Sequence, residues 1–173
     1  MVCAAGPASG VGTLVRLARN RGWVVQVMAT PAAVAHIDVE ALEEQTGRPV
    51  RSQHRVPGDL RSPKADAIIA PATFNTINKL ANGIADNYVL DVANEAIGLG
   101  VPTVILPFVN SAYAARAPFR RSVEQLRDEG VPVLLGPGAF EPHEAGTGAA
   151  LRSGFPWQLA MDHVEKSSPR APG

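Results

Sequence analysis

The sequence predicts a three-layer α/β domain in which helices cover both faces of a parallel sheet. Short runs rich in Val, Ile and Ala alternate with longer amphipathic segments along most of the 173 residues. These runs are nearly continuously apolar, which is typical of strands that are buried on both faces. Alternation of strand and helix favours right-handed crossovers and a parallel sheet. We therefore expect a Rossmann-like or flavodoxin-like domain that binds its ligand at the carboxyl ends of the strands.

The expected strands share a high content of β-branched and small apolar residues. Their apolar pattern is too short for most helices, and turn residues flank several of them. The segments expected to form strands are MVCAA (1–5), WVVQVMA (23–29), DAIIA (66–70), VPTVILP (101–107) and VPVLL (131–135).

The expected helices lie between these runs and show an apolar stripe. In the first helix, Leu14, Leu17 and Ala18 share one face, and Gly22 is a stop signal. The segments expected to form helices are GVGTLVRLARNRG (10–22), TFNTINKLANGI (73–84), NYVLDVANEAIGLG (87–100) and APFRRSVEQLRDEG (117–130).

Other segments break this alternation. Residues 45–64 are basic and rich in Pro and Gly, which predicts an exposed loop or a short edge strand. Residues 135–156 are rich in Gly and Pro and are interpreted as a mobile flap over a site. We expect one domain over residues 1–164 and a disordered tail over residues 165–173.

Composition favours a small-molecule ligand. Lys and Arg together number 16, as do Asp and Glu, so no net field favours nucleic acid or an anionic membrane. The longest apolar run, residues 101–109, is too short to span a bilayer. The single cysteine, Cys3, fits a reducing cytoplasm. His36 and His163 look incidental, and the four scattered histidines give no metal-ligand spacing.

Polar residues follow the first two expected strands. Ser9 and the amides of Gly10 and Val11 open a helix, where unpaired N–H groups favour a phosphate. The alternative is that Ser9 only caps the helix. Thr30 and Pro31 repeat the arrangement after the second strand. The spacing of the first loop is not that of a dinucleotide fingerprint, which argues against NAD or FAD.

A denser cluster follows the third strand. Thr73, Asn75 and Thr76 converge on the crevice where this fold places its ligand, and a helix cap explains only one of them. The chain leaves the fourth strand through Pro107 and presents Asn110 and Ser111. Recurrent polar residues at strand ends predict one extended ligand, and the clusters suit one terminal phosphate.

At these residues the chain resembles a known family. PATFNTINKLANGIADN (71–87) is similar to the P-A-S/T-A-N-T and K-I-A-x-G-I-A-D-N signature of the homo-oligomeric flavin-containing cysteine decarboxylases, which include phosphopantothenoylcysteine decarboxylases and lantibiotic-type peptidyl-cysteine decarboxylases. PFVNSAYA (107–114) resembles their P-x-M-N-x-x-M-W segment. The resemblance covers about residues 2–136 and implies FMN held between subunits of a homo-trimer or a dodecamer of trimers.

The resemblance also implies site residues. Those matching positions around the flavin and its phosphate are Ser9, Gly10, Thr30, Ala72, Thr73, Phe74, Asn75 and Thr76. Asn110 matches the asparagine that helps to bind the substrate carboxylate. A neutral carboxamide holds a carboxylate without hindering loss of carbon dioxide, as differential binding requires.

The family mechanism uses the isoalloxazine as hydride acceptor. The cysteine thiol is oxidised toward a thioaldehyde, which is the electron sink for decarboxylation to an enethiolate, so the hard redox chemistry belongs to the cofactor. The implied base is a histidine about eight residues before the position of Asp66. His54 is the nearest candidate but lies twelve residues before Asp66. His143 is a weaker substitute.

The chain departs from the family pattern in further places. Phe74 replaces a small residue, and its ring is expected to stack near the flavin or to narrow the pocket. The 107–114 segment lacks the family's methionine and tryptophan. Pro142 stands where phosphopantothenoylcysteine decarboxylases have a reducing cysteine, and Cys3 is expected to be a core residue. The predicted product is therefore an enethiol, made from a C-terminal cysteine of a peptide or similar substrate.

Other functions stay open. The chain can be a flavin-binding partner or regulatory subunit that has lost decarboxylase activity, as the missing residues and displaced histidine indicate. PASGVG (7–12) also resembles the glycine-alanine-serine-glycine loop of flavin prenyltransferases, although Asn75 and Thr76 stand where those enzymes typically have lysine and threonine.

Overall fold

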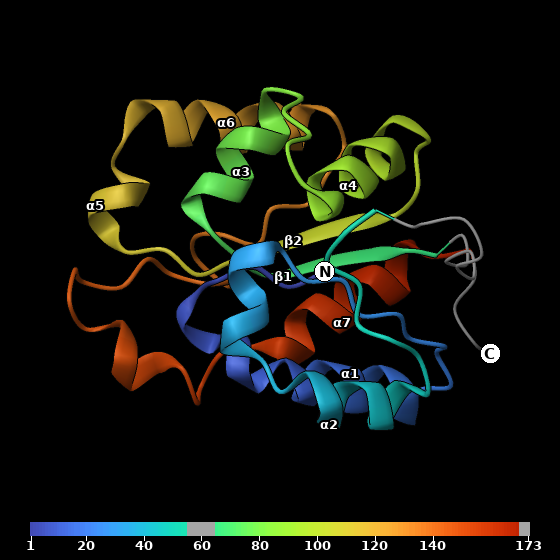
Figure 1. Cartoon of the computed structure of the whole chain (residues 1–173). Coiled ribbons are helices and arrows are strands. Elements are labelled where there is room, and N and C mark those ends of the chain that lie inside the picture. The colour runs from blue at the N-terminus through green and yellow to red at the C-terminus, as the bar shows by residue number, and fades with distance from the viewer. Residues whose placement is uncertain (55–64, 170–173) are drawn as a thin grey trace.

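The centre of the molecule is a parallel sheet whose core pair is β1 (Ala67–Ala72) and β2 (Thr103–Pro107). Ile69 pairs with Ile105 in the middle of this pair. Every residue of β2 is buried, as expected for a strand covered on both faces. Figure 1 shows the computed structural model, which describes residues 1–54 and 65–169.

Shorter segments extend the sheet through parallel bridges. Val2 pairs with Ala29, Met28 pairs with Arg51, and Ile105 pairs with Val133. The first strand segment (residues 1–3) also bonds to β1, because the Cys3 amide donates to the Pro71 carbonyl at 3.2 Å. The strand order is therefore 3-2-1-4-5-6 when the segments are numbered along the chain, which is the doubly wound order that reverses beside the first segment.

Helices cover both faces of this sheet, and the predicted three-layer α/β fold is confirmed (Figure 1). α1 packs on α2 and α7 on one face, and α3 packs on α4 and α6 on the other. The helices are η1 (Gly6–Gly10), α1 (Val11–Asn20), η2 (Pro31–His36), α2 (Val39–Thr46), α3 (Phe74–Ala81), α4 (Tyr88–Gly98), α5 (Ser111–Ala114), α6 (Ala117–Asp128), η3 (Gly148–Leu151) and α7 (Trp157–Ser167).

Apolar stripes hold these helices against the sheet. α1 buries Val11, Leu14 and Val15, and it stops before Gly22, whose φ of 81° few other residues adopt readily. The α6 stripe buries Phe119 and other apolar side chains against α3. The core consists of two main apolar clusters, one between the sheet and α1 with α7, and the other between the sheet and α3 with α6.

The sequence prediction was wrong in two places. Residues 23–26 do not pair as a strand, and only Met28 and Ala29 of the expected 23–29 strand form bridges. The disordered tail expected from residue 165 does not begin there, because α7 continues to Ser167 and Glu165 forms a salt bridge with Arg21.

The two irregular segments differ in how they attach to the core. Arg51, from the expected loop or edge strand, pairs with Met28 at the edge of the sheet, whereas residues 55–64 lie outside the described part of the chain. Phe140 and Phe155, from the expected flap, are buried, and their ring centroids are 5.8 Å apart. The expected flap is therefore anchored to the core at both of these positions.

No helix among the described residues combines the length and the apolarity that crossing a bilayer requires.

Candidate functional site

The candidate site lies at the seam, which is the junction between the first strand segment (residues 1–3) and β1. The sheet winding reverses at this seam, and doubly wound folds bind ligands at the carboxyl ends of the strands there. The chain passes from the first segment into η1 and α1, and from β1 into α3. Both helices thus begin at the same edge of the sheet, with their unpaired N–H groups close to the seam.

Thr73, Thr76 and Cys3 meet at this seam. Thr73 is the N-cap of α3, and its Oγ1 accepts the Thr76 amide at 3.1 Å. The two threonine hydroxyls are 2.9 Å apart. Burial raises the pKa of the Cys3 thiol above its ordinary value, although the neighbouring Thr76 side chain and Thr73 backbone act in the opposite direction. Cys3 is thus a buried neutral thiol, as the sequence predicted for a core residue.

The Phe74 side chain packs against aromatic residues of two later helices. Its ring stacks on Phe119 of α6 with centroids 5.3 Å apart and on Tyr113 of α5 at 4.7 Å. It joins the first turn of α3 to the two helices that follow β2. Asn75 is exposed at the next position, so its carboxamide is free to meet a ligand without removing support from the core.

Ser9, Gly10 and Thr30 lie at the ends of the first and second strand segments. Ser9 is exposed within η1, and the N-cap of α1 is Gly10, so Ser9 does not make the helix cap that was its alternative role. Thr30 precedes Pro31 as the N-cap of η2, but its side chain makes no capping hydrogen bond. Thr30 is buried, with 8% of its surface exposed.

Asn110 lies at the carboxyl end of β2. Its Oδ1 accepts the Tyr113 amide at 2.9 Å and caps α5, so its Nδ2 group is directed away from the helix. Asn110 pairs with His143, and the Ser111 amide donates to the His143 carbonyl at 2.7 Å. The structure therefore places the weaker histidine candidate next to the predicted carboxylate-binding residue.

His54 lies away from this group. Its ring contacts Tyr88 edge-on at 5.3 Å, and its Nδ1 is 3.7 Å from the Asp91 carboxylate, both on α4. Within the described part of one chain, His54 makes no hydrogen bond, ion pair or ring contact with Asn110 or with the threonines of the seam.

The electrostatics of the edge suit an anion. The strand-end segments 3–10, 29–33, 71–76 and 107–111 contain hydroxyl and amide side chains but no Asp or Glu. Arg152 also lies beside the first loop, since a Cβ placed on Gly6 would be 3.3 Å from its Nε. Neutral donors, helix N-termini and one guanidinium together favour a phosphate group.

A cavity of about 370 Å³ lies beside this loop, lined by residues that include Gly10, Thr13, Arg152 and Trp157. A larger cavity, of about 510 Å³, lies at the opposite, amino edge of the sheet and includes none of the predicted site residues except His54. The larger cavity is therefore not the candidate ligand site. Among the described residues, His, Cys, Asp and Glu form no group of three that could hold a metal ion.

Sequence reasoning missed several residues of this edge. Arg152 was not singled out because its loop is joined to Gly6 only by the tertiary fold. Tyr113 was missed because it stands inside a segment that was compared with a methionine and tryptophan motif. The contact between its ring and the Phe74 ring joins two separate helices, so no local sequence pattern predicts it.

Comparisons with known proteins agree with this geometry. The sequence model of the Flavoprotein family matches residues 4–154. The Coenzyme A biosynthesis bifunctional protein CoaBC of Escherichia coli (strain K12) is 32% identical over an alignment of 138 residues that covers 72% of this chain and 32% of that protein. The chain thus spans about a third of the length of the curated relatives it matches.

Solved structures show the same fold. MrsD from Bacillus sp. HIL-Y85/54728 superposes with a TM-score of 0.71 at 24% identity, covering 95% of this chain and 91% of that one. TvaF, an FMN-dependent cysteine decarboxylase from thioviridamide biosynthesis, has a TM-score of 0.62 at 26% identity, with 94% and 95% covered. Since the family model spans most of the chain and the fold agrees with it, this protein belongs to the flavoprotein family.

Proposed function

We propose that this protein binds FMN at the carboxyl edge of its sheet and decarboxylates a C-terminal cysteine oxidatively. The observation that carries the proposal is the donor set at the seam, where the Thr73 and Thr76 hydroxyls are hydrogen-bonded and the segments 3–10, 29–33, 71–76 and 107–111 contain no Asp or Glu. The similarity to TvaF, an FMN-dependent cysteine decarboxylase, supports it.

The residues present fit FMN. The amides around Ser9 and Gly10, the α1 N-terminus and the buried Thr30 hydroxyl would hold the phosphate. Ala72, Thr73, Phe74, Asn75 and Thr76 would surround the ring system. When bound, FMN supplies a two-electron acceptor.

In the proposed reaction the cysteine Cβ–H bond breaks with its electron pair transferred to the oxidant, and the thiol proton leaves to give a thioaldehyde. The bond between Cα and the carboxylate then breaks, carbon dioxide departs, and its electron pair enters the C=S group to give an enethiolate. Asn110 would hold the carboxylate with Nδ2, since its Oδ1 is engaged by the Tyr113 amide. A neutral donor does not stabilise the carboxylate so strongly that decarboxylation is slowed.

The base that removes the thiol proton is proposed to be His54. Because His54 lies away from Asn110 within one chain, we propose that it acts in the site of a neighbouring subunit of a homo-trimer. His143 is the competing candidate, on the strength of its pairing with Asn110. Its Nδ1 is 2.9 Å from the Glu144 carbonyl oxygen, which can only accept, so Nδ1 is the donor there.

The proposed product is an enethiol. Pro142, next to His143, has no redox chemistry, so the position offers no group that could reduce the product further. Cys3 is buried at the seam with a raised pKa and is not suited to that role.

The first experiment is the absorbance spectrum of the purified protein, followed by release of the chromophore and its identification by mass. FMN is the expected chromophore. A colourless protein that also fails to bind added FMN would remove the proposal, because every later step depends on the cofactor.

The second experiment incubates the FMN-loaded protein with peptides that end in cysteine, and with matched peptides that end in serine. We expect the cysteine peptides alone to lose the mass of carbon dioxide and two hydrogens, and to react with a thiol-trapping reagent.

A second candidate function is an FMN-binding partner subunit without decarboxylase activity. The departure of the 107–114 segment from the family motif and the position of His54 favour it. Bound flavin, no turnover of any cysteine peptide, and a stoichiometric protein partner would support this function over the first.

A further inference from the structure

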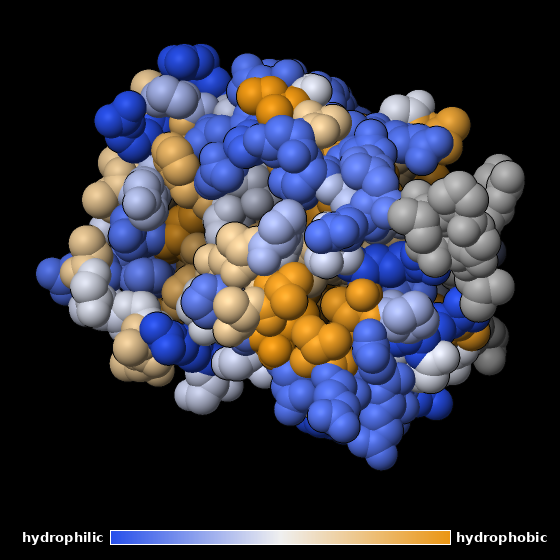
Figure 2. Space-filling model, viewed as in Figure 1, coloured by the Kyte–Doolittle hydropathy of each residue, from blue (hydrophilic) through white to orange (hydrophobic). Residues whose placement is uncertain are grey.

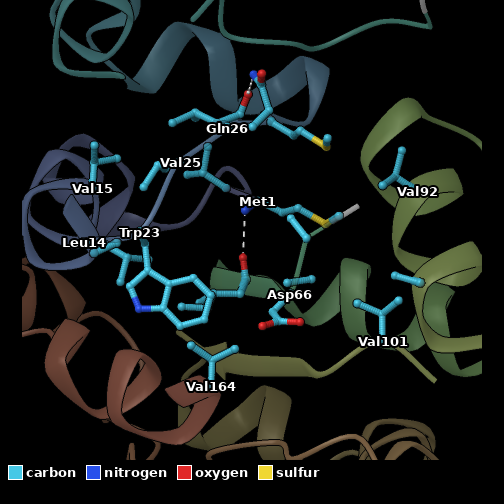
Figure 3. A pocket seen from close by; sticks show the side chains of 18 of the residues that line it. Met1, Leu14, Val15, Trp23, Val25, Gln26, Asp66, Val92, Val101 and Val164 are labelled. Carbon is cyan, nitrogen blue, oxygen red and sulfur yellow. Dashed lines mark hydrogen bonds between the residues drawn. The ribbon is translucent and has the colours of Figure 1, made fainter. Parts of the chain in front are cut away.

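The cavity of about 510 Å³ at the amino edge has the shape of a missing strand. It lies in the plane of the sheet, between residues 23–28 on one side and residues 65–68 on the other. α1 and α7 line it from one face, and α4 lines it from the other. In Figure 3, Val15, Trp23 and Val164 surround one side of the opening, Val92 and Val101 the other, and Met1 stands between them.

The backbone ladder beside this cavity begins only at Met1. The Met1 carbonyl accepts the Ala70 amide at 3.0 Å, and the Val2 amide donates to the Met28 carbonyl at 2.7 Å. The first strand segment therefore pairs with both neighbours, and its direction, traced backward from Met1, leads into the cavity. Residues 23–26 form no bridges because no strand lies beside them on the side of the first segment, whose pairing begins at Met1.

The walls of the cavity are mainly apolar, as those around a buried parallel strand must be. Leu14, Val15 and Met161 come from the helices of one face, and Val92 and Ala96 from the other. Val24 and Leu99 also line it, and each is 68% exposed, so the apolar lining continues to the mouth of the cavity. Figure 2 shows apolar surface in the middle of this face, close to the N-terminus marked in Figure 1.

The Met1 amine occupies the place of a peptide N–H. It donates to the Ile68 carbonyl at 2.7 Å, as a strand residue would donate to its neighbour. Burial lowers the pKa of this amine to about 6. A peptide N–H at the same place would keep the hydrogen bond and carry no charge.

We infer that the cavity is the seat of an additional extended apolar segment, joined covalently to the Met1 nitrogen and carried by a longer N-terminal form of this chain. At about 3.3 Å per residue, a segment of about four residues spans the distance covered by residues 24–27. A strand supplied by another molecule would bury a chain end beside Met1, whereas a joined strand replaces the amine by a peptide bond and buries none.

The test compares two N-terminal extensions of the complete chain. One adds Ile-Val-Ile-Val before Met1, preceded by Met-Lys for translation and solubility, and the control adds Ser-Gly-Asp-Ser in the same frame. Hydrogen exchange read by mass spectrometry follows peptides that cover residues 23–28 and 65–68. We expect the apolar extension to slow exchange in both peptides at least tenfold, and to abolish binding of an apolar dye such as ANS, while the polar control leaves both unchanged.

Three results would overturn the inference. The first is unchanged exchange and dye binding with the apolar extension, which would leave the cavity to some other occupant. The second is equal protection by the polar control, which would show that any tail suffices. The third is equal protection of the unextended protein by a free peptide of the same apolar sequence, which would favour a strand supplied by a partner.

Discussion

Asparagine side chains in this protein cap helices and also face the proposed ligand. Asn110 and Asn87 make the same cap, with Oδ1 accepting an amide three residues later, but only Asn110 lies at the carboxyl edge of the sheet. Asn75 is exposed on α3 and caps nothing. These differences allow ligand binding to be separated from folding at single residues.

Asn75→Ala is expected to weaken FMN binding about tenfold without changing stability, because one hydrogen bond to a bound group is worth about 1 to 1.5 kcal/mol. Quenching of flavin fluorescence during titration measures the affinity. The control is Asn82→Ala, at the other end of the same helix. Equal loss of affinity in both variants would mean that α3 as a whole, and not Asn75, affects the site.

Asn110→Asp should lose at least about a hundredfold in turnover of cysteine peptides while the protein keeps its melting temperature. Aspartate caps a helix as well as asparagine does, but its charge repels the substrate carboxylate. Asn87→Asp, which changes the same kind of cap on α4, is the matched control. Full activity of Asn110→Asp would contradict the proposed carboxylate contact.

The residues of the site were accessible to sequence reasoning only where they are close together in the chain. Thr73 and Thr76 belong to one motif, so the sequence alone predicts that they cluster, and their hydroxyls are hydrogen-bonded in the structure. The pairing of Asn110 with His143 and the position of Arg152 beside Gly6 depend on the return of a distant loop, which no local pattern encodes.

At the scale of elements, α7 ties the C-terminal part of the described chain to the sheet. Met161 and Trp157 are buried between α7, α1 and the strands, and Arg21 after α1 forms salt bridges with Asp162 and Glu165. The helix therefore closes one face of the fold.

Met161→Ala is expected to lower the free energy of unfolding by about 2 to 5 kcal/mol, the range for truncating a buried side chain of this size. Urea denaturation followed by far-ultraviolet circular dichroism measures the change. Leu151→Ala, at a residue that is 43% exposed, should cost much less and serves as the control. If the two variants are equally stable, α7 contributes little to the core.

α7 was missed from sequence for a physical reason. Its N-cap is Pro156, which makes no side-chain cap, so the usual start signal is lacking even though Trp157, Ala160, Met161 and Val164 have helical spacing. The central strands and α1, α3, α4 and α6 were predicted because burial and periodicity agree there. Residues 23–26 show the opposite case, since a β-branched run forms a strand only beside a pairing partner.

At the scale of the whole molecule, we propose an active site that combines residues of two subunits. His54→Gln and Asn110→Asp should each be inactive alone. When the two variants are dissociated, mixed and reassembled, heteromers regain part of the activity, because some sites combine an intact His54 with an intact Asn110. Light scattering confirms the assembly state. Full activity of His54→Gln alone would transfer the role of base to His143, and two inactive variants that do not recover activity on mixing would contradict the shared site.

The amino terminus predicts a pH dependence of stability. Burial lowers the Met1 amine pKa from 8.0 to about 6, so the unfolded chain binds this proton more tightly and stability is lost as pH falls from about 8 to about 6. Two units correspond to at most about 2.7 kcal/mol. The apolar extension used above moves the amine into solvent and should remove this slope.

Urea midpoints at about pH 5.5 and about pH 8.5 for both chains measure the difference. His54, Asp66, Asp91 and Glu95 also line the cavity, so the polar extension, which moves the amine into solvent without filling the cavity, is the control for their contribution. Parallel profiles for the two chains would show that the buried amine has no effect on stability.

The position of Cys3 allows local opening of the sheet to be measured by thiol modification. It is the only cysteine in the chain, it is 1% exposed, and it lies where the first strand segment meets β1. A thiol reagent can modify it only during excursions that part these two strands. The alkylation rate of Cys3 therefore reports how often the two strands separate. A ligand that bridges the seam will lower this rate in proportion to its occupancy.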